Sequence, residues 1–456
     1  MPIALRFPIA LVVCLALGAC SSVRPWINAP QRPGPATDVR AIAQRDSSAL
    51  FAVTLSGGGA RAAAFGYGVL QELHDTPCCW NDRSGNVLDS VDLVSGVSGG
   101  SIIATYFAAF GSEGLRRFET DFLRQDFQDG LLSQLLRPAN LYDLSSPWFG
   151  RSHLLERRLQ ELYGGMTYGD LAKRPRHPQL IVTASDLSLG TSFDFTEETF
   201  RLICSDLSSV PLSFAVASSS AVPLVLTPMT LRNYRGDCPV PATATAQRSQ
   251  PDLDYRARLF LSQERSYLDA AARPFIHLVD GGLADNLGVR RLLDRALSGG
   301  GMGATFGEVA IPPGSVHRLV LIVVNAQREA AHRIDESDRV PSSTDVADAL
   351  LFGAGDRATV ETEEFLVDIG RRFREELSTG RRWPSFAADA ELFLIQVNLQ
   401  DATESDERGK LLRVPTSFSI SEAEVTSLVA AGHQVLRRSK EFQALKKSLD
   451  VAEQTR

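Results

Sequence analysis

Short apolar runs alternate along the chain with segments whose hydrophobic residues recur at helical spacing. The runs read as buried β-strands at Phe51–Ser56, Val91–Ser95, Gln179–Asp186, Phe275–Asp280 and Arg318–Ala326. Helical patterns follow the first two runs, over Ala62–Leu73 and Ser101–Phe110. Buried strands that alternate with helices are typical of a parallel sheet covered on both faces. The pattern therefore predicts an α/β fold with a mostly parallel central sheet.

The pattern changes near residue 340. From there it predicts a long helical region, a strand and an amphipathic helix, at Thr344–Ser378, Glu391–Leu399 and Ser421–Leu449. We interpret residues 336–456 as a helical C-terminal extension that packs on the main domain over residues 48–335.

The N-terminus is typical of a signal peptide. One positive side chain in Met1–Arg6 precedes the apolar segment Phe7–Leu17, which is too short to span a bilayer. The sequence Leu17-Gly18-Ala19-Cys20 resembles the lipobox of bacterial lipoproteins. We therefore expect residues 1–19 to be removed and Cys20 to carry a lipid anchor. An ordinary secretory signal with an incidental cysteine is the alternative.

A lipid anchor would hold the protein at a membrane without a transmembrane helix. Ser21, in place of an aspartate, favours the outer membrane of the bacterial cell envelope. Residues 20–47 predict an extended tether, with ordered structure beginning near Leu50. The prolines of this segment are Pro25, Pro30, Pro33 and Pro35.

The composition is compatible with many classes of globular protein, but it argues against some classes of binding partner. The chain has 456 residues, of which 44% are hydrophobic and 22% charged, and its formal net charge is −7. This is ordinary for a globular protein with a sizeable core. The sequence has no Lys/Arg-rich run and no zinc-ligand spacing, so we expect no nucleic acid, no metal and no other cofactor. It indicates no obligatory protein partner.

The cysteines that would remain in the mature chain beyond Cys20 are Cys78, Cys79, Cys204 and Cys238. An oxidising envelope compartment permits disulfides, and four cysteines allow three pairings. Adjacent cysteines bridge each other only with strain, so Cys204–Cys238 is the pair we expect. Buried free thiols are the alternative.

The stretch Gly96-Val97-Ser98-Gly99-Gly100 fits G-x-S-x-G between a predicted strand and a predicted helix. That context is typical of a nucleophile elbow, in which a serine on a tight turn projects its hydroxyl beyond the strand. The helix that follows directs free N–H groups and a partial positive charge to the same place. Ser98 is therefore the candidate nucleophile, and a plain Gly/Ser turn is the alternative.

A serine hydroxyl needs a base. None of the histidines lies in an evident active-site loop: His74, His153, His177, His277, His317, His332 and His433. Asp280 instead ends a predicted strand directly before Gly281 and Gly282. An acid at that position can face the crevice beyond the sheet, where open α/β folds bind ligands. A turn-forming aspartate is the alternative interpretation.

Attack on an ester carbonyl builds an oxyanion, which needs fixed N–H donors. Gly57, Gly58 and Gly59 lie between a predicted strand and a predicted helix, so their amides are unobstructed by side chains. Arg61 adds a positive charge, unless it pairs with a carboxylate.

A dinucleotide site is the rival interpretation, because Gly57, Gly59 and Ala62 fit G-x-G-x-x-A. However, the stretch after the helix is polar and turn-like, where that site needs a second strand ending in an acid. We therefore favour the oxyanion interpretation.

The order SGGGAR, GVSGGS and DGG resembles the patatin-like phospholipase family over roughly Leu50 to Ala326. Val182–Gly190 and Ala215–Pro228 are similar to the segments between its motifs. The resemblance implies a three-layer α/β/α fold. It also implies a Ser98–Asp280 dyad without a catalytic metal, and an oxyanion site formed by Gly57, Gly58, Gly59 and Arg61.

Two positions depart from the family pattern. Ala62 stands where many members have glycine, and Gly288 where many have proline, two residues after the matching Asn286. Neither departure removes a catalytic group.

The sequence thus predicts a membrane-tethered serine acyl hydrolase with membrane lipids as substrates, of the phospholipase A or lysophospholipase type. A general carboxylesterase or thioesterase, and a non-catalytic envelope lipoprotein that retains the fold, are the alternatives. Head group, chain length and sn-position are not readable from these motifs.

Overall fold

The computed structural model describes residues 21–32, 48–80, 83–175, 177–238, 255–298, 312, 314–328, 338–342, 349, 354–378, 386–402 and 405–454. The expected signal peptide, residues 1–19, and Cys20 lie outside these residues.

An eight-stranded sheet forms the centre of the molecule, with strand order β10-β9-β1-β4-β5-β8-β7 and β6 paired to β5. The parallel strands are β1 (Ala49–Leu55), β4 (Leu93–Val97), β5 (Gln179–Asp186), β9 (Val316–Asn325) and β10 (Phe386–Asn398). The strands at the other side pair antiparallel and are β6 (Thr191–Asp194), β7 (Met229–Arg232) and β8 (Phe275–Val279). The predicted α/β fold with a mostly parallel sheet is confirmed, although β8 runs against its neighbour β5.

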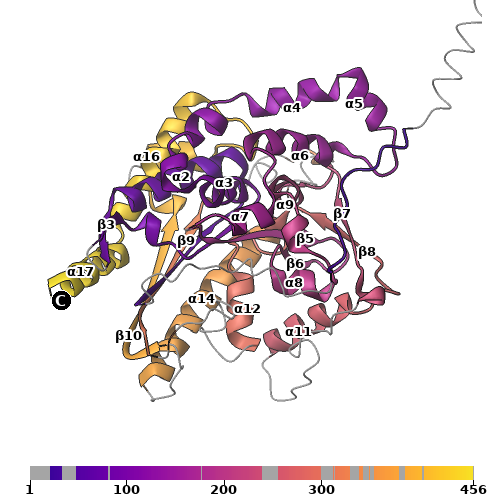
Figure 1. Ribbon diagram of the computed structural model, residues 1–456. Coiled ribbons are helices and arrows are strands. Elements are labelled where there is room, and N and C mark those ends of the chain that lie inside the picture. Colours follow the sequence, from indigo (N-terminus) through magenta and orange to yellow (C-terminus); the bar gives the residue numbers. More distant parts are fainter. Residues whose placement is uncertain are drawn as a thin grey trace, which may run out of the picture.

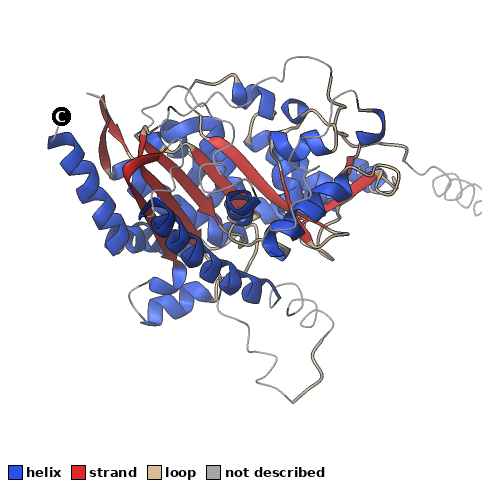
Figure 2. Cartoon of the chain, turned by 90° about the horizontal axis from the view of Figure 1, so that it is seen from below, coloured by secondary structure: helices blue, strands red, loops and turns tan. Residues whose placement is uncertain are grey.

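Helices cover both faces of the sheet (Figure 2). One face carries α2 (Gly59–Asp75), α3 (Gly99–Leu115), α6 (Arg151–Leu162) and α9 (Leu212–Ser219); the other carries α12 (Arg290–Ser298) and α14 (Ala354–Ser378). The other helices and the small hairpin are α4 (Phe127–Leu135), α5 (Pro138–Asp143), α7 (Tyr168–Ala172), α8 (Glu197–Leu202), α11 (Tyr255–Tyr267), α15 (Ser405–Leu412), α16 (Glu422–Arg438), α17 (Lys440–Gln454), β2 (Pro77–Trp80) and β3 (Arg83–Asn86). Among the described residues, no helix is long and apolar enough to cross a bilayer.

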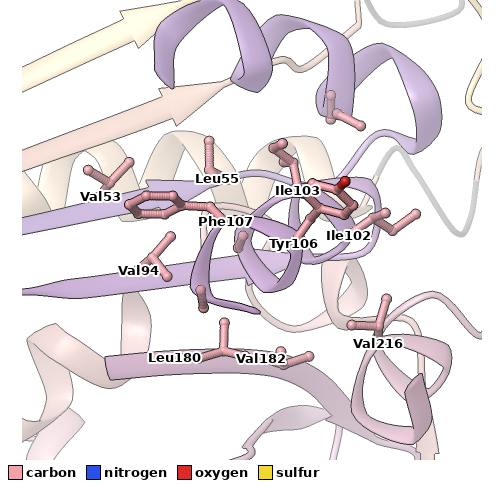
Figure 3. Close-up of a cluster of buried hydrophobic side chains, with 14 of the residues drawn as sticks. Val53, Leu55, Val94, Ile102, Ile103, Tyr106, Phe107, Leu180, Val182 and Val216 are labelled. Carbon is pink, nitrogen blue, oxygen red and sulfur yellow. The ribbon is translucent and has the colours of Figure 1, made fainter. Parts of the chain in front are cut away.

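Side-chain alternation along β1 explains why its sequence is apolar throughout. Phe51, Val53 and Leu55 belong to the larger core beneath α2 and α3, whereas Leu50 and Ala52 belong to the second core beneath α12 and α14. Figure 3 shows the first of these cores, in which residues of α3 lie over the neighbouring strands. A strand buried on both faces needs hydrophobic residues at odd and even positions alike.

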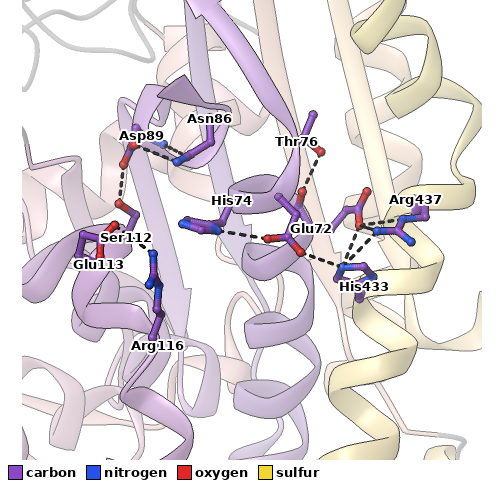
Figure 4. Close-up of polar contacts among 11 residues, drawn as sticks. Glu72, His74, Thr76, Asn86, Asp89, Ser112, Glu113, Arg116, His433 and Arg437 are labelled. Carbon is purple, nitrogen blue, oxygen red and sulfur yellow. Dashed lines mark hydrogen bonds and ion pairs between the residues drawn. The ribbon is translucent and has the colours of Figure 1, made fainter. Parts of the chain in front are cut away.

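The C-terminal residues are integral to this body. β10 adds a parallel strand at the edge of the sheet, beside β9. α16 packs on α2 at a close approach: a Cβ built on Gly68 would lie 2.0 Å from the Val429 carbonyl oxygen, and one on Gly432 would lie 2.2 Å from that of Phe65. Beside this contact, the buried Glu72 carboxylate pairs with Arg437 and His433 (Figure 4). The single helix expected over 421–449 is two helices, which meet at Ser439.

The expectation of a tether with order beginning near Leu50 is wrong for Ser21–Arg32, which lies against the domain. Asn28 is fully buried, and its side chain donates to Ser205 Oγ (2.8 Å) and to the Arg232 carbonyl (2.9 Å). Proline composition suggested a free linker, but the polar groups between the prolines have partners on the domain. The expected disulfide is confirmed, because Cys204 and Cys238 are bonded.

Candidate active site

Ser98 occupies the turn between β4 and α3. Its backbone is in the left-handed region, with φ 49° and ψ −120°, a conformation that costs a non-glycine residue energy and is concentrated at functional sites. The Ser98 amide donates to Ser219 Oγ (2.8 Å), and the Ser219 hydroxyl donates to the Thr183 carbonyl (2.6 Å). The tight turn predicted from G-x-S-x-G is therefore present and is fixed from β5 and α9.

The glycines after Ser98 are required by the backbone that lies against them. A Cβ on Gly99 would lie 2.0 Å from the Gly59 carbonyl oxygen, and one on Gly100 would lie 2.3 Å from that of Leu55. No side chain fits at such distances. The two glycine-rich motifs of the sequence are thus in main-chain contact with each other.

Asp280 follows β8 and is 8% exposed. Its carboxylate accepts a hydrogen bond from the Gly282 amide (2.9 Å), and Asp280 and Ser98 line the same cavity. Burial raises the pKa of Asp280 to about 6, while hydrogen bonding from the Gly282 amide and the Ser98 side chain opposes the shift. Gly281 permits this placement, since a Cβ there would lie 2.1 Å from the Thr183 carbonyl oxygen.

The glycine loop after β1 differs in part from the expectation. The Gly57 amide donates to the Asn286 carbonyl (3.0 Å), so it is not the open oxyanion donor that we predicted. Gly58 and Gly59 have positive φ values of 141° and 61° and lead into α2, whose N-terminus has no side-chain cap. The amides at the start of a helix have no partner within it and favour negative charge. The amides of Gly58 and Gly59 therefore remain the candidate donors to an oxyanion.

The identified hydrogen-bond partners of Arg61 are neutral groups. The side chain is 2% exposed, and Nε donates to the Ala326 carbonyl at 2.9 Å. Nη1 donates to the Val414 carbonyl at 2.5 Å, and Nη2 lies 3.4 Å from Thr416 Oγ1. The guanidinium therefore joins the glycine loop to the end of β9 and to the C-terminal residues.

A C-terminal segment beside the site was not foreseen from the sequence. The Ala60 amide donates to the Ser417 carbonyl (2.7 Å), and a Cβ on Gly59 would lie 2.3 Å from the same oxygen. We call Val414–Ser417 the C-terminal strap. Nothing in its composition marks it as part of a site, because it acts through main-chain carbonyls.

A cavity of about 50 Å³ lies over Ser98 and Asp280. Its lining comprises Gly57, Gly58, Arg61, Ser98, Val222, Pro223, Asp280, Gly282, Leu283, Asn286, Gln327, Arg328 and Thr416. None of these residues is a histidine. His277 is exposed on β8 and contacts Thr230 Oγ1 (3.0 Å). Asn286 was singled out only through the resemblance; its side chain lies against Gly57 and Gly282.

The described part of the chain holds no group of three or more His, Cys, Asp or Glu residues arranged to bind a metal. The predicted site residues that the structure brings together around this cavity are Ser98, Asp280, Gly57, Gly58 and Arg61, and Gly59 begins helix α2 beside them. This arrangement pairs a hydroxyl with a buried carboxylate beside helix-terminal amides, which suits nucleophilic attack on a carbonyl carbon.

The family model described as patatin-like phospholipase matches residues 53–293, more than half of the chain. No match was found among curated proteins. Among solved structures, human GIVD cytosolic phospholipase A2 is 12% identical, with a TM-score of 0.41 over 91% of this chain and 64% of that one, so this chain spans slightly less than two thirds of its length. VipD from Legionella pneumophila is 11% identical, with a TM-score of 0.34 over 95% of this chain and 73% of that one. Through the match to the family model, the chain belongs to the patatin-like phospholipase family.

Proposed function

We propose that the protein is a serine acyl hydrolase that cleaves fatty-acyl esters of lipids, with Ser98 as nucleophile and Asp280 as its general base. The placement of Ser98 and the buried Asp280 carboxylate in the lining of one cavity supports the proposal. A base must reach the proton that it removes, and the lining that these two residues share contains no histidine to act between them. A pKa of about 6 leaves Asp280 mostly ionised at neutral pH and still basic enough to accept a proton.

The reaction follows from these positions. Asp280 takes the hydroxyl proton while Ser98 Oγ attacks the ester carbonyl carbon, and the amides of Gly58 and Gly59 hold the resulting oxyanion. The C–O bond to the leaving alcohol then breaks, and Asp280 returns the proton to that oxygen. Water, deprotonated by Asp280, attacks the acyl-enzyme; the fatty acid leaves and Ser98 recovers its proton.

Phospholipids and lysophospholipids are the substrates we favour, on the strength of family membership. A general carboxylesterase or thioesterase is the second candidate, and the size of the cavity favours it. About 50 Å³ is well below the roughly 300–1,000 Å³ of typical ligand pockets, so a long acyl chain needs the loops to move. A non-catalytic envelope lipoprotein is the outcome if no ester is cleaved.

A fluorophosphonate probe tests the nucleophile. We expect it to label the wild-type chain and not Ser98→Ala, and to label Asp280→Asn far more slowly. His277→Ala is the control and should label like wild type, because that side chain is exposed and lies outside the cavity lining. Loss of labelling in His277→Ala with normal labelling in Asp280→Asn would overturn the dyad.

Products identify the substrate class. Mass spectrometry of vesicles of phosphatidylethanolamine and phosphatidylglycerol should show free fatty acid and lysophospholipid. Turnover of p-nitrophenyl butyrate or an acyl thioester without release from vesicles or lysophospholipid would assign the carboxylesterase or thioesterase function instead.

We also propose that Cys20 is acylated and that the mature protein resides in the outer membrane of a bacterial envelope. The support is the lipobox-like sequence and the serine that follows it. Metabolic labelling with an alkyne fatty acid should mark the wild-type chain and not Cys20→Ser. Membrane fractionation then distinguishes the inner from the outer membrane.

A further inference from the structure

Large hydrophobic side chains are exposed on one side of the molecule, around the path from α4 to α6. Leu132 and Leu136 belong to α4 and its end, Leu141 and Tyr142 to α5, and Trp148 to the connection with α6. Leu136 is 78% exposed. Figure 1 shows α4 and α5 together at the outer edge of the layer that contains α6. Exposed apolar side chains that gather in one region mark an interaction site of a folded domain.

A loop from the active site joins this surface. Val222 and Pro223 line the cavity, and the next two residues, Leu224 and Val225, are 72% and 62% exposed. The loop lies on the start of α6, where Arg151 Nη2 donates to the Leu224 carbonyl (2.8 Å). Trp148 is three residues before Arg151. The exposed leucine and valine therefore lie next to the cavity lining and beside the start of α6. We call Leu132, Leu136, Leu141, Tyr142, Trp148, Leu224 and Val225 the apolar face.

Leu224 is held in a strained conformation, with φ 71°. A branched, non-glycine residue with positive φ is uncommon, and such strain persists only where the surroundings impose it. Here the surroundings direct a large aliphatic residue into solvent at the entrance of the site. Core packing cannot account for this, because the side chain is not in the core.

The described N-terminal segment also ends beside α5. The Ser21 amide donates to Ser145 Oγ (2.9 Å), and the Ser146 hydroxyl donates to the Val23 carbonyl (2.6 Å). The Arg24 guanidinium lies 4.0 Å from the centre of the Trp148 ring. Cys20, the expected acylation site, immediately precedes Ser21 in sequence.

We propose that the apolar face is a bilayer-docking surface, on which the protein lies against phospholipid with its active-site entrance at the membrane. The inference deepens the proposed function and rests on it for the identity of the substrate. A bilayer is favoured over a second copy of the chain for two reasons. Trp148 and Tyr142 have the apolar body and polar tip that suit a membrane interface, with the exposed cations Arg24 and Arg151 beside them. An acyl anchor before Ser21 would hold this same face at the membrane.

The arrangement accounts for the small cavity. A membrane-bound chain would contact lipid through Leu224 and Val225. Insertion of these side chains into the bilayer would move their loop, and with it Val222 and Pro223, which line the cavity. The acyl chain would then pass from bilayer to Ser98 without crossing water.

Photo-crosslinking tests the orientation without using activity. Benzoylphenylalanine is placed singly at Leu136, Tyr142 or Leu224 in the full chain, which is then bound to vesicles of phosphatidylethanolamine and phosphatidylglycerol. The matched controls are Val360 and Val367 on α14, which are 57% and 52% exposed and lie over the opposite face of the sheet. Intact mass after illumination reports lipid adducts.

We expect adducts at the three test positions to exceed those at both controls several-fold. Equal adducts at test and control positions would overturn the proposal, as would their absence at 136, 142 and 224 in the vesicle-bound protein. Protein–protein adducts at these positions would assign the face to a second copy of the chain. The result is independent of catalysis, since the same labels can be read in Ser98→Ala; failure of the acyl hydrolase proposal would therefore be seen separately, as an inactive but correctly oriented protein.

Discussion

Gly99 lies so close to Gly59 that a Cβ on the former would be 2.0 Å from the carbonyl oxygen of the latter. The elbow that carries the candidate nucleophile and the loop that carries the candidate oxyanion donors are thus placed relative to each other by direct backbone contact. Their separation leaves no room for even a methyl group. This contact converts two separate sequence motifs into one site.

Gly99→Ala should therefore separate the elbow from the loop. We expect a loss of stability of about 1–3 kcal/mol, typical of overpacking, together with loss of fluorophosphonate labelling. Urea unfolding and the labelling rate measure the two effects. Gly409→Ala is the control, because nothing lies within 4 Å of a Cβ there and the residue is in helix α15. That change should leave labelling intact and stabilise the helix by up to about 1 kcal/mol.

The pH dependence of turnover should follow Asp280. The carboxylate must be ionised to accept the Ser98 proton, so kcat/KM on a soluble ester should rise through pH of about 6 and then level off. A pH–rate profile checks this. A rise centred near pH 4 would mean that burial does not shift the group, and a second rise above neutrality would point to a different base.

The free energy of unfolding should also depend on the Asp280 carboxylate. Ionisation of this group favours activity but lowers the stability of the folded chain. Its folded pKa of about 6 exceeds the ordinary value of 3.8, so the folded chain retains a proton that the unfolded chain has lost between these values. Stability from this group therefore falls as pH rises from about 4 to about 6 and stays reduced above. Asp280→Asn should be the more stable protein at pH 8 by about 1–3 kcal/mol, and the gain should shrink at pH 4. Thermal unfolding at both pH values tests this.

Arg61 should behave as a positioning residue. Its guanidinium group donates hydrogen bonds to the carbonyls of Ala326 and Val414 at the same time, which a lysine ammonium cannot reproduce. Arg61→Lys should lose about 2–4 kcal/mol of stability, because hydrogen bonds to charged groups contribute about 1.5–3 kcal/mol each. Labelling of Ser98 should slow as well, with no change in the midpoint of the pH–rate profile. Arg116→Lys, directly after α3, is the control, because this arginine is exposed. It should change neither the stability nor the labelling rate.

The disulfide should stabilise the region where the N-terminal segment docks. Closing a 34-residue separation is expected to contribute about 3–4 kcal/mol by restricting the unfolded chain. Cys204→Ser with Cys238→Ser should lower Tm, and dithiothreitol should lower the wild-type Tm to a similar value without affecting the double variant. A wild-type Tm insensitive to reductant, with full reduction verified by mass, would contradict this prediction.

The sequence predicts a feature when side chains form its contacts, and it fails when main-chain atoms form them. Strands β1 and β5 were predictable because both faces of each are buried, which leaves an apolar run. Ser98 and Asp280 were predictable because a nucleophile and an acid at strand ends need particular residues and flanking glycines. Catalysis by these two residues remains a prediction, although both of them line the same cavity.

Other features left no readable signal. The C-terminal strap acts through the carbonyls of Val414 and Ser417, which any residue could supply. The docking of Ser21–Arg32 relies on a few polar contacts such as those of Asn28, amid prolines that equally suit a free linker. The hydrogen bond that occupies the Gly57 amide depends on the backbone of Asn286, more than two hundred residues away.

The position of the C-terminal strap in the sequence also affects when the site can form during synthesis of the chain. Ribosomes release a chain from its N-terminus onward, so Ser98 and Asp280 emerge long before residues 414–417, which buttress the start of α2 through Ala60 and Arg61. A nascent or truncated chain can hold both reactive side chains and still lack the support for its glycine loop. Hydrolytic competence would then arrive only with the finished polypeptide, and a cell whose membranes contain the proposed substrate would be protected until then.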